Sequence, residues 1–335
     1  MVQTKTYPIW MLRLVPSGRW GRWIVAAAIL AAGVAIYVPA ISIVTENPER
    51  WRNYFAWPPA LFFVCAIAYI VPTFHFSTAR SHRALDQLTA YFRNPGDLEA
   101  ARASLDQRSA LWFMRVVLFS IALWLVQSRL LAGSWEYMWQ RTGEGYVAIV
   151  MDFGSLPVWL TMNTAISALV RNALTFRRLV PKLETNILDP QSFMPIGRMA
   201  VTSTLVVLGA MASLSIMWID GPTDLWTTLP AVLIFTPVLA LLLLLPVWPL
   251  HRELLRQRVA AVARAQAQIP AKPGAPGPAG GQLAQALALR RELARLPVWP
   301  FDVGSVTRFV SYAVIVPLTW AGAALIEMLV NVLLE

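Results

Sequence analysis

The sequence carries little charge for its length. Only 14% of its 335 residues are Asp, Glu, Lys or Arg, whereas 57% are hydrophobic. A soluble domain has about a quarter charged residues. There is also a single cysteine, Cys65, which excludes an intramolecular disulfide and any metal site that needs two cysteines. This composition predicts a polytopic membrane protein.

Histidine and lysine are scarce as well, and the motifs of several enzyme classes are missing. The three histidines, His75, His82 and His251, all lie at or beyond the inner membrane surface in the topology given below. Multi-histidine oxygenase and bis-histidine haem sites need more ligands within the membrane, so both are disfavoured. No lysine falls in an apolar run, which excludes a retinal Schiff base. H-E-x-x-H, Rossmann and P-loop motifs are absent too. We therefore expect no enzyme activity, no cofactor and no metal.

Long apolar runs are what the sequence does contain. A helix needs roughly 20 residues to cross about 30 Å of hydrocarbon. Seven runs reach that length, near residues 22–44, 54–76, 109–131, 147–170, 199–219, 227–249 and 307–334. The sequence thus predicts an all-α protein with seven transmembrane helices embedded in a lipid bilayer.

The cations are distributed unevenly between the segments that join these runs. If the N-terminus lies inside, all but four of the 28 lysines and arginines fall on the cytoplasmic side, while the 18 acidic residues divide evenly. The four outer cations are Arg50, Arg52, Arg129 and Arg141. The positive-inside rule then predicts a cell-membrane protein with its N-terminus in and its C-terminus out. Topology accounts for the net charge of +10, so we expect no nucleic-acid partner.

A long charged segment, residues 251–296, separates the first six runs, in residues 1–250, from the last run, in residues 297–335. Its centre, residues 270–281, is rich in Pro and Gly and cannot be helical. Apolar residues recur at helical spacing on both sides of this tip, at Leu255, Val259 and Val262 and at Ala286, Leu289, Leu293 and Leu296. We predict an antiparallel cytoplasmic stalk of two helices. Helices four, six and seven are all expected to extend into this cytoplasmic helical region.

The pentapeptide Leu-Pro-Val-Trp-Pro occurs twice, at residues 245–249 and 296–300, where the stalk leaves and re-enters the membrane. Two interpretations are open. Proline breaks helices and tryptophan anchors at interfaces, which explains each copy alone. Alternatively, the two copies pair as a hinge, formed by Pro246, Pro249, Pro297 and Pro300.

Aromatic residues gather near the outer surface, and one carboxylate lies within a span. Asp152 sits about two turns below the outer rim, where a charge usually faces a cavity or a partner. It is a candidate ligand contact, or else part of a buried pair with Arg129 or Arg141. The predicted outer pocket, for a small organic ligand, consists of Trp57, Trp135, Asp152, Trp159 and Trp218.

The layout resembles the seven-transmembrane ion channel superfamily, which includes the insect odorant and gustatory receptors. The likeness is architectural and covers most of the chain: seven spans, helices four and six extended into the cytoplasm, and a last span split into a cytoplasmic and a membrane helix. The Thr-Tyr-rich signature of gustatory receptors is missing from Phe309 to Leu334. The resemblance implies a homotetramer with the last helix lining a cation pore. The Ala- and Arg-rich composition indicates a bacterial inner-membrane protein.

The polar and small residues of the last helix define the candidate pore lining, which comprises Ser311, Thr319, Gly322, Ala323, Glu327 and Asn331. Four copies of Glu327 near the outer mouth would form an acidic ring that favours cations. The alternative is that Glu327 and Asn331 only mark the outer interface.

Three functions follow from these features. The first is an oligomeric, ligand-responsive cation channel with the last helix at its axis. The second is a non-conducting sensor or scaffold that recruits a partner through the outer face of the stalk, at Arg256, Arg264, Arg290 and Arg291. The third is a small-molecule transporter that uses Asp152 as its coupling carboxylate.

Overall fold

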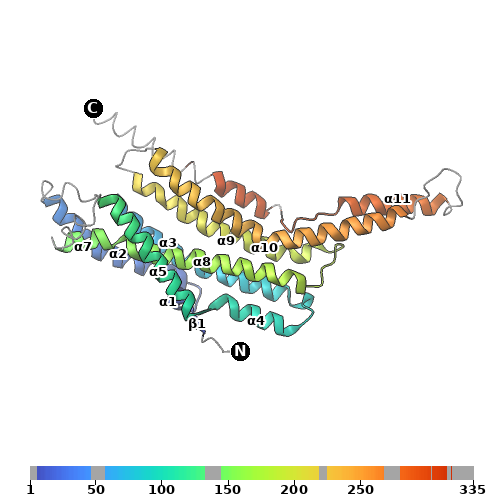
Figure 1. Cartoon of the computed structure of the whole chain (residues 1–335), viewed down its shortest axis with the longest axis horizontal. Coiled ribbons are helices and arrows are strands. Elements are labelled where there is room, and N and C mark those ends of the chain that lie inside the picture. Colours follow the sequence, from blue (N-terminus) through green and yellow to red (C-terminus); the bar gives the residue numbers. More distant parts are fainter. Residues whose placement is uncertain are drawn as a thin grey trace.

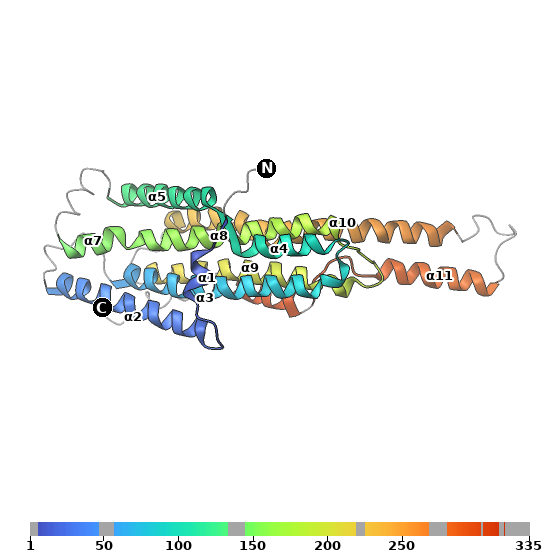
Figure 2. The same cartoon turned by 90° about the horizontal axis from the view of Figure 1, so that it is seen from below.

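The computed structural model describes residues 6–46, 57–132, 145–218, 225–267, 280–302, 304–314 and 318. Long helices lie nearly parallel in an elongated bundle (Figures 1 and 2). Within the described ranges the only strands are β1 (Thr6–Pro8) and β2 (Gln107–Ser109), which pair antiparallel with Thr6 opposite Ser109. This pairing and the short helix α1 (Trp10–Leu14) fasten the N-terminal segment to the bundle.

Five of the described helices are long and apolar enough to cross a membrane: Gly21–Glu46, Ala60–Gln87, Ala110–Ser128, Pro190–Ile216 and Thr236–Ala267. They belong to α2 (Gly21–Glu46), α3 (Trp57–Gln87), α5 (Ala110–Ala132), α9 (Met194–Ala212) and α10 (Leu225–Ala267). The chain is therefore an all-α protein with the character of a multi-pass membrane protein. These helices correspond to predicted spans one, two, three, five and six.

The predicted fourth span has a different structure. It consists of α7 (Tyr146–Phe153) and α8 (Ser155–Leu179), which meet at Gly154. α7 has only eight residues, and polar residues at Thr161, Asn163 and Thr164 lower the hydropathy of α8, so neither helix is among the five apolar ones. The predicted seventh span, 307–334, lies largely outside the described residues. The count of seven spans and the orientation stay predictions.

α10 is a single helix of 43 residues and runs through Pro237, Pro246 and Pro249 without a break. The sequence allowed the first Leu-Pro-Val-Trp-Pro copy to be either a helix break or part of a hinge, but it lies inside this helix. Val247 and Leu250 are fully buried between α10 and its neighbours, and this packing holds the helix together although proline removes backbone hydrogen bonds. At 1.5 Å per residue α10 is about 65 Å long, roughly twice the hydrocarbon thickness, so it must project beyond a membrane.

Two hydrophobic cores succeed each other along the bundle. The first joins α2, α3, α5, α8 and α9 around residues such as Val71 and Leu169. The second joins the end of α3, α4 (Pro95–Asp106), the end of α8, η3 (Pro190–Phe193) and the middle of α10, with Phe176 and Phe193 fully buried. The sequence explains why α4 begins here, because the Asn94 side chain caps the helix and accepts a hydrogen bond of 3.0 Å from the Gly96 amide.

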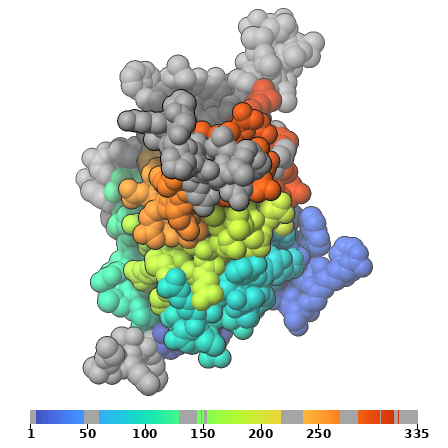
Figure 3. Space-filling view, turned by 90° about the vertical axis from the view of Figure 1, so that its right-hand side faces the viewer, coloured from blue at the N-terminus to red at the C-terminus, as the bar shows by residue number. Residues whose placement is uncertain are grey.

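The remaining elements are short, apart from α11 (Gly280–Arg295). η1 (Thr89–Tyr91) and η2 (Val180–Lys182) lie near α4, and η4 (Ser213–Trp218) follows α9. α11 packs antiparallel along the far half of α10, and the pair extends well past the rest of the bundle (Figures 1 and 2). We call α11 and residues 251–267 of α10 the stalk. Seen from the stalk end, α10 and α11 in orange lie above α8, α3 and α4 (Figure 3).

Candidate functional site

The two Leu-Pro-Val-Trp-Pro copies come together where the stalk meets the bundle. The indoles of Trp248 and Trp299 lie 6.4 Å apart, and His251 stacks on Trp299 with ring centroids 3.9 Å apart. A hydrogen bond of 3.1 Å joins His251 Nδ1 to the Val298 carbonyl oxygen. The second copy is not helical, so Pro297 and Pro300 lie in the connection between α11 and residues 304–314. We call residues 296–302 the junction.

The junction is pressed closely against α9. No space is left for a side chain at Gly197, because a Cβ atom there would overlap the carbonyl oxygen of Pro300. Arg198, the next residue of α9, forms an ion pair of 3.2 Å with Asp302. The hydrogen bonds from Ser305, together with Arg198, hold the pKa of the Asp302 carboxyl below its usual range. Asp302 thereby links α9 to the start of the last helical segment, which begins at residue 304.

Residues 304–314, the main described part of the last helix, are mostly exposed. Phe309 packs on Leu208 and Met211 of α9. A stripe spaced by four residues, Val306, Val310, Val314 and Leu318, is exposed instead. Of the predicted pore residues, Ser311 is described and lies exposed on this segment. Thr319, Gly322, Ala323, Glu327 and Asn331 lie outside the described residues.

The predicted outer pocket can be placed only in part. Trp159 is partly buried in α8 and its indole N–H donates to Gln127 Oε1 of α5, so it already has a partner within the bundle. Trp57 begins α3, Asp152 lies in α7 and Trp218 ends η4, but their side chains are outside what the structure describes. Trp135 is outside it altogether.

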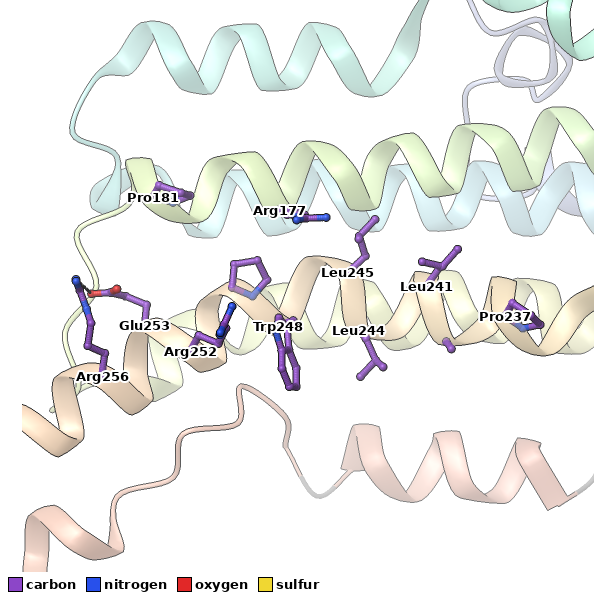
Figure 4. Close-up of a pocket in the computed structure, with 12 residues that line it drawn as sticks. Arg177, Pro181, Pro237, Leu241, Leu244, Leu245, Trp248, Arg252, Glu253 and Arg256 are labelled. Carbon is purple, nitrogen blue, oxygen red and sulfur yellow. Dashed lines mark hydrogen bonds and ion pairs between the residues drawn. The ribbon is translucent and has the colours of Figure 1, made fainter.

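A groove that the sequence did not predict lies between α8 and α10 (Figure 4). It has a volume of about 1220 Å³. Arg252 and Arg256 of α10 line one end, and Leu241 and Leu244 of α10 line the other. Arg177 of α8 faces the middle of the groove, near Leu245 and Trp248 (Figure 4). Trp248 lies between the two ends. We call this the basic groove.

A second groove runs along the stalk, between α10 and α11. It is lined by Val259, Val262 and Ala263 together with Arg258 and Arg290.

The predicted contact stripe between the two stalk helices is only partly correct. Ala286 and Leu293 are buried, but Val259 and Leu289 are 60% and 49% exposed, since the real contact between the helices is rotated toward Ala265.

Metal and cofactor chemistry was not expected, and the described residues contain no group of three or more His, Cys, Asp or Glu side chains that would hold a metal ion. No family model matches the chain, and no curated protein or solved structure matches it either. The function proposed below therefore rests on the stalk, the grooves and the last helix.

Proposed function

We propose that the chain forms a homo-oligomer, a tetramer, in which the stalks hold the subunits together and the last helices surround a cation pore. The proposal keeps the architecture of the seven-transmembrane ion channel superfamily as its template. Its assembly part is supported by the described residues. Its conduction part is supported by the sequence of the last helix.

The observation that carries assembly is the exposure of apolar side chains on the stalk. Exposed apolar residues on a membrane helix need no partner other than lipid. The stalk is different, because Arg252, Glu253, Arg256, Arg258 and Arg264 follow one another in α10 and make this region too polar for a bilayer interior. Val259 and Leu289 would then face water in a lone chain. A second subunit packed into the groove beside them would remove this apolar surface from water.

The last helix also exposes apolar side chains that neighbouring subunits could cover. Its described part lies at the edge of the bundle and touches α9 through Phe309, while Val306, Val310 and Val314 point away. A helix with one side on its own subunit and an apolar stripe on the other suits a central position in an assembly. The residues beyond it, with Glu327 four turns further on, would then approach the symmetry axis.

Placing a charge on the exposed stalk surface should dissociate the oligomer. In Val259→Asp or Leu289→Asp the carboxylate would be buried at the proposed contact without a partner, which costs several kcal/mol. We expect mass photometry of the purified protein to show mainly single chains for these variants and oligomers for the parent.

Ala260→Asp is the matched control for Val259→Asp, because Ala260 is exposed on the same helix and lies outside the stalk groove. Ala288→Asp is the control for Leu289→Asp, because Ala288 is exposed beside Leu289 but presents a much smaller apolar side chain. They should leave the oligomer intact. A parent protein that is monomeric at all concentrations, or equal dissociation by all four variants, would contradict assembly through this surface.

Conduction is tested separately at Glu327. In Glu327→Gln an acidic ring would lose its charge, so the preference for cations over chloride should fall severalfold in bilayer recordings. Glu335→Gln removes another carboxylate from the same segment and should change the preference far less. An unchanged preference in Glu327→Gln would exclude this residue from a selectivity filter.

The alternative function is a non-conducting scaffold. It is favoured by the positive rim of the stalk groove, where Arg258 and Arg290 flank the apolar floor. Such a groove also suits an acidic amphipathic helix of another protein. A monomeric parent that shows no conductance, yet loses a cytoplasmic partner in Val259→Asp and not in Ala260→Asp, would favour the scaffold over the channel.

A further inference from the structure

The basic groove has one cationic end, and its charge is largely uncompensated. Among the described residues neither Arg177 nor Arg252 forms an ion pair, while Arg256 pairs with Glu253 at 2.9 Å. Three guanidinium groups therefore face one carboxylate. Guanidinium groups bind phosphate through paired, charge-assisted hydrogen bonds, so this end of the groove suits a phosphate group.

The other end of the same groove is apolar. Leu241, Leu244 and Trp248 follow one face of α10, and each is between 43% and 48% exposed. Figure 4 shows Arg177 reaching from α8 toward α10, with the leucines further along the helix from Arg252. Leu241 lies eleven residues before Arg252, which is about 16 Å along a helix and matches one leaflet of a bilayer.

The order of these residues distinguishes a lipid from a soluble anion. A free phosphate would use the arginines alone and gain nothing from the leucines. Trp248 lies between the two ends, and tryptophan is the residue that prefers the membrane interface. Basic pockets between membrane helices are known to hold anionic lipid head groups.

From this arrangement we propose that the basic groove binds one anionic phospholipid. Its phosphate lies between Arg177 and Arg252, with Arg256 at the outer edge of the groove, and an acyl chain follows Leu244 and Leu241 along α10. Because Arg177 belongs to α8 and the other two arginines belong to α10, the bound lipid ties these helices together at the point where the stalk begins. The proposal does not depend on oligomer formation or on conduction.

Native mass spectrometry of the purified full-length chain tests the site. The protein would be titrated with dioleoylphosphatidylglycerol and, in parallel, with dioleoylphosphatidylcholine, which has the same acyl chains but no net charge. We expect the first adduct of phosphatidylglycerol to form at least about tenfold more tightly than that of phosphatidylcholine. Each arginine contributes about 1 kcal/mol near a lipid surface, or roughly fivefold in affinity. Arg177→Gln and Arg252→Gln should each weaken phosphatidylglycerol binding by about that factor.

Control variants distinguish lipid binding in the basic groove from lipid binding elsewhere on the protein. Arg264→Gln removes an exposed arginine of α10 outside the groove and should leave binding unchanged. Leu241→Ser with Leu244→Ser should weaken both lipids. If Arg177→Gln does not fold, Arg252→Gln tests the charge, and Arg177→Lys, which keeps the charge, should lose less affinity than Arg252→Gln.

Two results would overturn the proposal. One is equal affinity for the two lipids, or equal loss in Arg177→Gln and Arg264→Gln, which would mean that the lipid binds elsewhere. The other is displacement of phosphatidylglycerol by millimolar inorganic phosphate with no effect of the leucine substitutions. That outcome would reassign the groove to a free anion.

Discussion

Gly197→Ala should detach the junction from α9 and destabilise the protein. The added Cβ would overlap the Pro300 carbonyl oxygen and come within 3.0 Å of the Phe301 ring. A carbonyl oxygen belongs to the backbone and cannot rotate away as a side chain can, so the whole junction has to move. Overpacking of this kind costs about 1–3 kcal/mol, and sometimes more. We expect a lower unfolding midpoint in detergent, measured by thermal or SDS titration.

The position of the junction can be followed with one thiol. In a Cys65→Ser background, Val298→Cys places a cysteine at a site that is 9% exposed. Maleimide should label it slowly in the parent and rapidly when Gly197→Ala is added. Gly304→Ala is the matched control, because its Cβ would meet nothing closer than 3.8 Å. Equal midpoints and equal labelling in the two glycine variants would contradict the close packing of α9 and the junction.

Arg108→Ala should destabilise the bundle still more. Arg108 is buried, and its guanidinium donates to Asn172 Oδ1 at 2.7 Å, to the Gln107 carbonyl at 2.8 Å and to the Ser104 carbonyl. Burial, with a smaller contribution from Arg171, lowers the pKa of Arg108 to about 10, so the group stays charged at neutral pH. Alanine would leave these acceptors without a donor and create a cavity. The expected loss is about 2–4 kcal/mol of unfolding free energy.

Arg102 provides the comparison for Arg108. It lies on the adjoining helix α4 and forms an exposed ion pair with Asp86. Exposed pairs contribute about 0–1 kcal/mol, so Arg102→Ala should shift the SDS-unfolding midpoint much less. If the two variants unfold alike, the hydrogen bonds of Arg108 do not stabilise the contact among β2, α4 and α8.

The elements that could be predicted are those set by local chemistry. A helix that crosses hydrocarbon must be apolar over about 20 residues, so the helices at Gly21–Glu46 and Ala110–Ser128 are readable from hydropathy alone. The turn at Asn94 and Pro95 is likewise local, because asparagine caps a helix and proline fits its first turn.

Features that depend on distant residues could not be predicted. Prolines at 246 and 249 argued for a break, yet burial of Val247 by other helices keeps α10 continuous. The rotation that turns Val259 outward is set by how two helices meet, because either of two adjacent stripes would satisfy the sequence pattern. The basic groove was missed because Arg177 lies 75 residues before Arg252 in the chain. The part of the groove that could have been read locally is on α10, where an apolar stripe is followed by Arg252 and Arg256 four residues apart.

The unbroken course of α10 gives the molecule a mechanical property. A helix of 43 residues is about 65 Å long, and α10 stays one helix over this whole length. A tilt of about five degrees at its membrane end would swing the other end by about 6 Å, given that length. α11 would be carried with it, and the junction would be pulled through Trp299 and His251. A change at one end of α10 would therefore be felt at the stalk and at the junction together.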